Sequence, residues 1–167
     1  MALSTPFNLT QRGLAANAGV TTSKYPHSQV ATHSALKTIS ARFSGPDATT
    51  TKGAALALND VFQLVSIPAG AFVLGVAAKV VTAEGATCTF SIGDGNQTAG
   101  YISAADGNAA TNVFSWDESP ASLATTYGVG HFYSAADTID LLLASGTAAT
   151  AVIDVTVTYI DTTPVTH

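Results

Sequence analysis

One segment, residues 60–82 (DVFQLVSIPAGAFVLGVAAKVVT), limits what this chain can fold into. It contains two apolar runs separated by Pro-Ala-Gly at 68–70, and this tripeptide favours a chain reversal because Pro fixes φ and Gly tolerates any φ. We therefore predict strands at 61–67 and 71–82. Alternation in the second strand places five apolar residues on one face: Phe72, Leu74, Val76, Ala78 and Val80. An alternation of this length is typical of a half-buried β-strand.

The same strand pattern recurs along the chain, with turn signals about every 8–12 residues. Further strands are predicted at 36–43, 86–92, 99–103, 112–116, 126–133, 138–144 and 150–160. Residues 44–53 are predicted to form a polar loop, because Gly45 and Pro46 interrupt the alternation. No helical pattern of about 10–15 residues alternates with the strands, which excludes βαβ folds. We expect an all-β fold, an antiparallel two-sheet β-sandwich that is jelly-roll-like with about eight strands.

The first 35 residues differ from the rest because they show neither a strand period nor a helical one. Their composition is that of a flexible tail. We interpret residues 1–35 as an extended N-terminal arm that lies on a partner or a sister subunit, and residues 36–167 as the β-sandwich body.

The surface is expected to be poor in charge. Only 10% of the residues are charged, against about 25% in an ordinary domain. A surface of Ala, Thr, Ser and Gly suits burial against neighbours, although a stable isolated β-domain with small surface residues stays an alternative. Residues 1–53 carry a net charge of +4 and residues 54–167 a net charge of −9. This division favours docking of the first third onto an acidic protein surface, such as the body of a neighbouring copy.

The basic residues of the first third are too scattered for a nucleic-acid arm, since they form no Lys/Arg run. Protein partners are therefore expected, and no nucleic acid. The candidate partner-binding residues are cations and aromatic residues of the arm and the first strand: Phe7, Arg12, Lys24, Tyr25, Lys37 and Arg42.

Targeting signals are not evident. The N-terminus lacks the basic start and apolar block of a signal peptide, and no apolar run approaches the ~18 residues that span a bilayer. We expect a protein made in the cytoplasm that is soluble or assembled, with no membrane partner. The single cysteine, Cys88, shares a face with Phe90 and Ile92 and is predicted to be a small buried hydrophobe.

Candidate chemical sites are weak. His27 and His33 lack zinc-ligand spacing, and His131 is predicted to be a partly exposed strand residue. The turns at 93–96 and 106–108 carry oxygen ligands that suit calcium, but Asp-Gly and Gly-Asn pairs are also ordinary turn chemistry. Four aromatic residues could form a sugar platform or fill the core: Tyr101, Trp116, Tyr127 and Tyr133. We predict no catalytic residue, no cofactor, no resident metal and no small-molecule substrate.

Four sequence patterns occur in the order found in small head proteins of tailed bacteriophages. They are D-V-x-x-L-x-x-I-P-A-G at 60–70, T-F-S-I-G-D-G at 89–95, G-Y-I at 100–102 and A-A-D-T-I-D-L at 135–141. Residues 60–160 therefore resemble capsid decoration proteins, also called cement or head-stabilising proteins. The resemblance does not include residues 1–35.

This resemblance implies a structural virion protein without catalytic residues. It implies a homotrimer on the outside of the capsid, whose arms clamp neighbouring major capsid subunits. Three alternatives stay open: a glycan- or receptor-binding module of a head or tail fibre that uses Tyr101, Trp116 or Tyr127, a small jelly-roll coat protein, and an enzyme on a jelly roll. The enzyme is the least favoured, because no metal-ligand set or nucleophile motif is evident.

Overall fold

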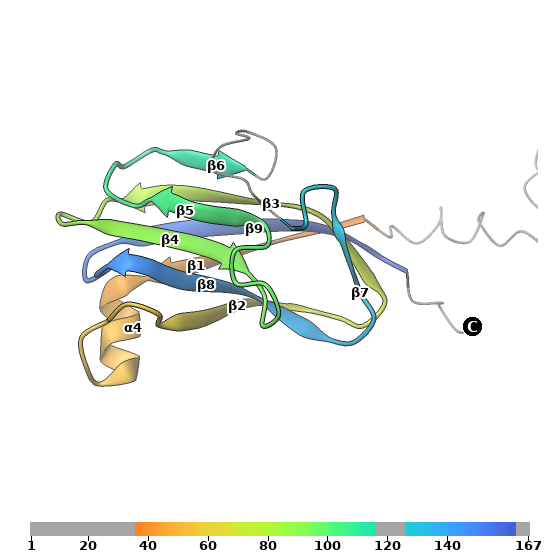
Figure 1. Ribbon diagram of the computed structural model, residues 1–167, viewed down its shortest axis with the longest axis horizontal. Coiled ribbons are helices and arrows are strands. Elements are labelled where there is room, and N and C mark those ends of the chain that lie inside the picture. The colour runs from red at the N-terminus through yellow and green to blue at the C-terminus, as the bar shows by residue number, and fades with distance from the viewer. Residues whose placement is uncertain (1–35, 116–125, 163–167) are drawn as a thin grey trace, which may run out of the picture. The chain divides into compact units, whose positions relative to one another are not determined.

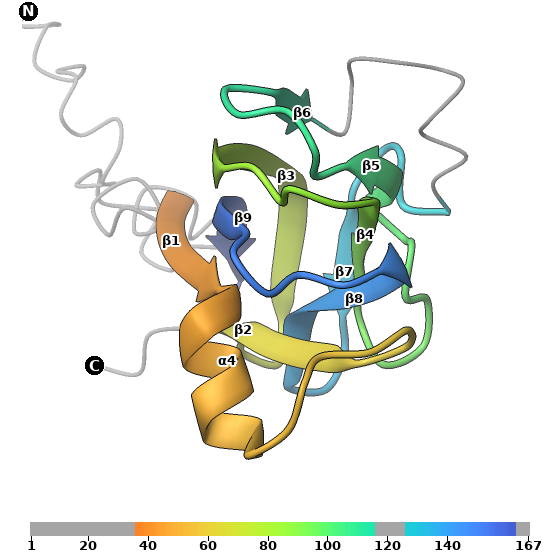
Figure 2. The same cartoon turned by 90° about the vertical axis from the view of Figure 1, so that its left-hand side faces the viewer.

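The computed structural model describes residues 36–115 and 126–162, and these residues form a sandwich of two antiparallel sheets (Figures 1 and 2). The elements are β1 (Leu36–Ser44), α4 (Gly45–Lys52), β2 (Val61–Ile67), β3 (Ala71–Thr82), β4 (Cys88–Gly93), β5 (Ile102–Asp106), β6 (Val113–Ser115), β7 (His131–Tyr133), β8 (Asp137–Gly146) and β9 (Val152–Asp161). The predicted arm, residues 1–35, lies outside the described residues. No helix among the described residues is long and apolar enough to cross a membrane.

The strands pair like one long hairpin that has been rolled up. β4 pairs with β5, β3 with β6 and β7, β2 with β8, and β1 with β9. The two remaining pairings, β3 with β9 and β4 with β8, join these pairs into a five-stranded sheet β1-β9-β3-β6, with β7 also on β3, and a four-stranded sheet β2-β8-β4-β5. This is the jelly-roll arrangement, so the predicted fold class is confirmed.

The core lies between the two sheets and is built from the inward positions of every long strand. The inward residues of β4, β8 and β9 alternate along each strand and are exposed by 4% or less, which confirms the shared buried face predicted for Cys88, Phe90 and Ile92. They are Cys88, Phe90, Ile92, Ile139, Leu141, Leu143, Ile153, Val155, Val157 and Tyr159.

The facing of β3 was predicted correctly for only half of the strand. Its register against β9 shifts between Val73 and Gly75, so one extra residue is inserted there. Such a β-bulge moves the following residues to the opposite face. As a result Val76 and Val80 are buried as predicted, but Val73 is buried in place of Phe72.

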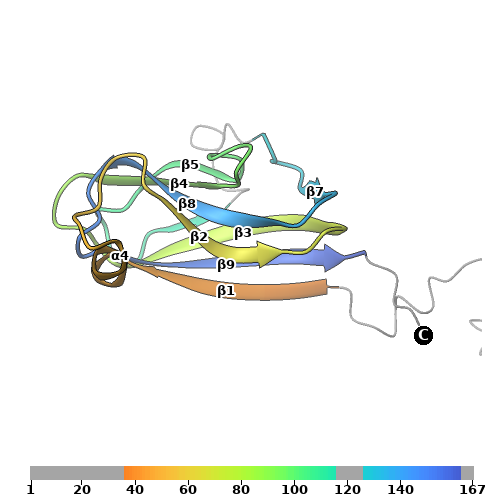
Figure 3. The same cartoon turned by 90° about the horizontal axis from the view of Figure 1, so that it is seen from below.

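The predicted loop at 44–53 is instead the helix α4, which lies at one end of the sandwich beside the ends of β1 and β2 (Figures 1 and 3). The Ser44 side chain caps its N-terminus by accepting from the Asp47 N–H, and Pro46 occupies the first turn. Gly53 ends the helix in the left-handed conformation with φ of 72°. The prediction of a loop was wrong because Gly45 and Pro46 interrupt a strand pattern but are compatible with the first turn of a helix.

The predicted strand at 126–133 is shorter than expected. Only His131–Tyr133 form a strand, and residues 126–129 form a turn that leads to Gly130 with φ of 96°. A Cβ at Gly130 would lie 2.8 Å from the carbonyl oxygen of Val73, so only glycine fits this approach to β3. Of the predicted strand at 112–116, Val113–Ser115 is confirmed and Trp116 lies outside the described residues.

Candidate functional site

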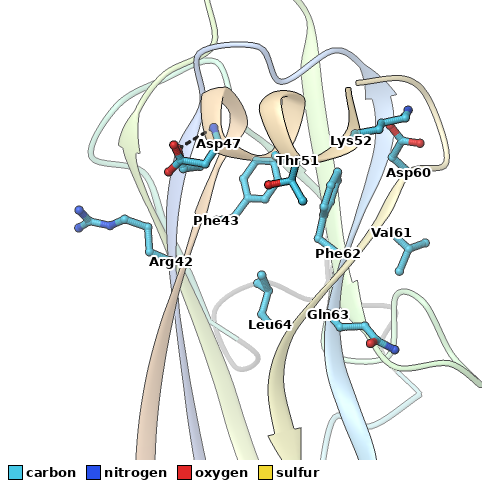
Figure 4. Close-up of a pocket in the computed structure, with 12 residues that line it drawn as sticks. Arg42, Phe43, Asp47, Thr51, Lys52, Asp60, Val61, Phe62, Gln63 and Leu64 are labelled. Carbon is cyan, nitrogen blue, oxygen red and sulfur yellow. Dashed lines mark hydrogen bonds and ion pairs between the residues drawn. The ribbon is translucent and has the colours of Figure 1, made fainter. Parts of the chain in front are cut away.

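A groove of about 510 Å³ opens between α4, the last residues of β1 and the first residues of β2 (Figure 4). We call it the α4 groove. Its floor is apolar and consists of Phe43, Phe62 and Leu64, with Ala48 of the helix on one side. The Phe43 and Phe62 rings are tilted against each other with centroids 4.9 Å apart. Phe43 is buried, whereas Phe62 and Leu64 are half-buried, so part of the core is open to the surface here.

The α4 groove opens here because β1 and β2 are both edge strands. β1 is the last strand of the five-stranded sheet, and β2 is the last strand of the four-stranded sheet. Within the described ranges, each therefore pairs with a neighbouring strand on one side only. Edge strands of this kind are the parts of a sheet to which another chain can add.

The rim of the α4 groove is polar. The Lys52 ammonium forms an ion pair with Asp60, and the Asp60 carboxylate also accepts from the Ala57 N–H. The hydrogen bond from Lys52 lowers the pKa of Asp60, and the bond from Ala57 adds to this effect. Asp47 also lies at the rim, and its carboxylate has no ion pair among the described residues.

Two predicted partner-binding residues, Lys37 and Arg42, lie on β1 and are held by β9. Arg42 donates two hydrogen bonds to Asp154, at 2.6 and 2.8 Å. Lys37 donates to Asp161 at 2.7 Å, and its ammonium lies 5.9 Å from the centre of the Tyr159 ring. In each case the hydrogen bond to the carboxylate is the main cause that raises the pKa of the cation. Arg42 lines the α4 groove, whereas Lys37 lies toward the other end of β1.

The other predicted partner-binding residues lie outside the described residues, in the segment 1–35. They are Phe7, Arg12, Lys24 and Tyr25. Their role stays a prediction.

The turn after β4 is organised by a buried carboxylate. Asp94 is 0% exposed, and its Oδ1 atom accepts from the N–H groups of Asn96 and Gln97, both at 2.8 Å. Two tyrosine hydroxyls complete its surroundings. Tyr133 donates to Oδ2 at 2.9 Å, and Tyr127 donates to Oδ1 at 3.3 Å. Because Tyr133 uses its proton on Asp94, Tyr101 donates to the Tyr133 oxygen at 3.1 Å. We call these four residues the Asp94–tyrosine cluster.

The Asp94–tyrosine cluster contradicts the sugar platform for three of its four members. Tyr101, Tyr127 and Tyr133 are at most 7% exposed, so their rings are not available to stack on a sugar. Burial is the main cause that raises all three tyrosine pKa values, that of Tyr127 to about 12. The fourth member, Trp116, lies outside the described residues.

Three other candidates have structural roles. The Asp106 carboxylate accepts from the Asn108 N–H and side-chain amide, so the turn at 106–108, like that at 93–96, follows ordinary Asx-turn chemistry. His131 is partly exposed, as predicted, and stacks on Tyr127 with ring centroids 3.9 Å apart. Cys88 is fully buried, as predicted, and burial raises its pKa to about 11, so it is a poor nucleophile. No group of three or more metal-ligating residues is found in the described part of the chain.

The α4 groove could not be predicted from the residues alone, because two edge strands and a helix that was predicted as a loop create it. The one local signal was Ser-Gly-Pro-Asp at 44–47 followed by Gly53, which is an N-cap, a proline in the first turn and a C-terminal glycine. The tyrosines of the cluster were singled out, but their burial around Asp94 depends on contacts across 33 and 39 positions of sequence.

Comparison with known proteins identifies the fold. No family model and no curated protein matches this sequence. A chain in the acid-stable capsid structure of Helicobacter pylori bacteriophage KHP30 is similar in structure, with 18% identity and a TM-score of 0.52 over 77% of this chain and 89% of that chain. A chain in the capsid asymmetric unit of cyanophage Pam1 is also similar, with 18% identity and a TM-score of 0.51 over 75% of this chain and 84% of that chain. The jelly-roll sandwich described above is therefore a fold that also occurs in phage capsids.

Proposed function

We propose that this chain is a structural protein of a bacteriophage virion, a decoration or cement protein on the outside of the capsid. The observation that carries the proposal is the similarity of the whole jelly-roll sandwich to chains of two phage capsid structures. The order of the sequence patterns between 60 and 141 supports the same class of protein. In this role the protein has no catalytic activity and works by binding.

We assign different roles to two parts of the chain, on the basis of their charge and of the described contacts. The segment 1–35 and β1 clamp neighbouring major capsid subunits, and the sandwich from residue 36 onward is a rigid platform, with three copies forming a homotrimer. The low charged fraction of 10% suits a protein that is surrounded by other proteins. The burial of Tyr101 and Tyr127 leaves the glycan-binding alternative without the two described residues on which it depended.

A binding assay on capsids tests the proposal. Capsids assembled from the major capsid protein without this chain are mixed with the purified full chain, sedimented and imaged. We expect the chain to sediment with the capsids and to increase their resistance to heat or to loss of divalent ions. Deletion of residues 1–35 is expected to abolish binding, whereas a scrambled segment of the same length and composition serves as a control for bulk and charge.

Three results would contradict the proposal in different ways. Absence of binding by the full chain removes the capsid role. Formation of closed shells by this chain alone identifies a coat protein. Binding of a sugar on a glycan array, together with absence of capsid binding, identifies a receptor module.

A further inference from the structure

We propose that the α4 groove binds the N-terminal segment, residues 1–35, of a second copy of this chain, with an aromatic side chain of that segment as the anchor. The inference rests on the proposed function only in that a capsid holds several copies side by side. The proposed capsid role requires only that residues 1–35 bind some partner. The inference goes further, because it names the surface that they bind.

The first argument is the shape of the α4 groove. Its volume of about 510 Å³ lies within the roughly 300–1,000 Å³ of ordinary binding pockets. Figure 4 shows Phe43 of β1 and Phe62 of β2 close below α4, with Thr51 of the helix between them in this view and Leu64 further along the strands. An apolar floor with a polar rim accepts one large apolar side chain while the neighbouring backbone stays in contact with polar groups.

The second argument is the free edges on both sides. Among the described strands, β1 pairs with β9 alone and β2 with β8 alone, so near the groove both offer backbone groups to an extended peptide. Addition of an extended segment to such an edge gives backbone hydrogen bonds, and a pocket for one side chain gives specificity.

The third argument is charge. The segment 1–35 contains Arg12 and Lys24 and no acidic residue, whereas residues 54–167 carry a net charge of −9. At the α4 groove, Lys52 and Arg42 are already held in ion pairs, and the Asp47 carboxylate has none among the described residues. A cation of the incoming segment therefore has an acidic partner at the rim.

The fourth argument concerns which copy supplies the segment. It joins the body at Leu36, and the α4 groove lies at the Ser44 end of the same strand. Nine residues of strand separate the two points, roughly 30 Å at 3.3 Å per residue. A segment that filled its own groove would have to turn back along β1, whereas the groove of a neighbouring copy needs no reversal. The contact is then head-to-tail, and such a contact closes into a ring when the rotation between copies allows it.

The aromatic residues of the segment are few, which makes the anchor testable. Phe7 and Tyr25 are the two aromatic residues in 1–35. Aromatic side chains are enriched among the residues that contribute most to binding at protein interfaces.

The test is self-association of the full chain in solution, measured by sedimentation velocity over a wide concentration range. A groove variant, Thr51→Tyr, places a ring over the floor from an exposed position of α4. The matched control is Thr50→Tyr, which adds the same ring at the adjacent exposed position of α4, outside the groove lining. An anchor variant carries Phe7→Ala and Tyr25→Ala. We expect at least about tenfold weaker self-association for the groove variant and for the anchor variant, and no change for the control.

Mixing the two defective variants separates a contact between copies from a contact within one chain. The groove variant keeps an intact segment, and the anchor variant keeps an intact groove. Equal mixtures are therefore expected to regain one contact per pair and to form heterodimers. Melting temperatures of all variants are measured in parallel, and Val61→Asp replaces Thr51→Tyr if the latter lowers the melting temperature by more than the control does.

The inference is overturned if the full chain is monomeric, because the segment is then bound within its own chain or not at all. It is also overturned if the chain self-associates and neither variant weakens it, since another surface then joins the copies. A chain that binds capsids yet shows either result retains its proposed function and loses only the groove contact.

Discussion

The two ends of the sandwich differ in which groups they bury and which they expose. At the end formed by the β4–β5 turn and β7, the Asp94 carboxylate is fully buried and accepts four hydrogen bonds, and three tyrosine rings cover it. At the α4 end, Phe62 and Leu64 are only half-buried, and the rim is made of exposed ion pairs. One end is closed by hydrogen bonds to a buried carboxylate, and the other leaves apolar side chains partly exposed among the described residues.

This difference indicates that one end of the sandwich contributes mainly to folding stability and the other mainly to binding. A buried carboxylate with all its donors is costly to disturb, because each donor that loses its acceptor remains buried. Exposed ion pairs contribute little to folding, since water and salt screen them. Substitutions at the Asp94 end are therefore expected to affect folding, and substitutions at the α4 groove are expected to affect association.

The largest effect is expected for Asp94→Ala. Two backbone N–H groups and two tyrosine hydroxyls lose their acceptor, so we expect a loss of about 3–4 kcal/mol in the free energy of unfolding. Urea titration followed by tyrosine fluorescence measures it. The control is Asp106→Ala, which removes a similar but exposed turn carboxylate. Equal losses for the two variants would show that the tyrosines contribute nothing at this end.

A smaller effect is expected for Phe62→Ala in the α4 groove. Replacing a fully buried phenylalanine by alanine lowers the free energy of unfolding by about 3–5 kcal/mol. We expect a loss of this size for Phe90→Ala in the closed core. Phe62 is half-buried, so the expected loss is about 1–2 kcal/mol. Thermal unfolding of both variants checks the ratio. If Phe62→Ala cost as much as Phe90→Ala, the groove would already be covered in the isolated chain, and its openness would have no functional meaning.

The smallest effect, and the one that depends on pH, is expected for Asp140. This residue pairs with Gly93 in the four-stranded sheet and is 6% exposed, and its buried Oδ1 atom has no hydrogen-bond partner in the part of the chain that the structure describes. Burial is the main cause that raises its pKa, and the charges of Asp137 and Asp94 add to it. The folded state therefore binds this proton more tightly than the unfolded state does. The resulting stability is present below the ordinary carboxyl pKa of about 3.9 and is lost as pH rises through the folded value.

Asp140→Asn removes the charge that the folded state disfavours. We expect it to raise the free energy of unfolding by about 1 kcal/mol at pH 7 and by little at pH 3, where the natural carboxyl is protonated. Urea titrations at a series of pH values measure the difference. A benefit that stayed constant across this range would assign the effect to packing instead of charge.

The alternation of apolar residues and the positions of turn-forming residues were sufficient to predict the sandwich. The positions of β2, β3 and β9 and the buried faces of β4, β8 and β9 follow from alternation, because each of these strands has one face against the core. Alternation failed at the bulge near Leu74, since an extra residue changes the facing without changing the composition. The prediction of a loop at 44–53 was also wrong, because Gly45 and Pro46 were interpreted as loop residues, whereas Ser44, Pro46 and Gly53 are the capping and first-turn residues of α4.

The candidate site was less predictable than the fold for a physical reason. Lys37 and Arg42 are predicted to be partner-binding cations, but a sequence cannot reveal that β9 brings Asp161 within hydrogen-bonding distance of Lys37 and places Asp154 opposite Arg42. The groove needs β1 and β2 to lie at the edges of different sheets, and strand order was not readable from the residues. The aromatic residues were recognised as either a platform or core, and only the position of buried Asp94 decides between these for Tyr101, Tyr127 and Tyr133.

The pairing of β1 with β9 has a mechanical consequence. All nine residues of β1, from Leu36 to Ser44, are matched to β9, and Leu36 lies opposite Ile160 (Figure 3). A force that pulled residue 36 away from residue 162 would open this ladder one rung at a time, starting at the weakest point. A force between Leu36 and a partner seated in the α4 groove runs along the strand instead, and the covalent backbone of β1 carries it from Leu36 to the groove at the Ser44 end. If copies are linked from segment to groove, as we propose, tension in that link therefore passes along the backbone of β1 and does not open the β1–β9 ladder.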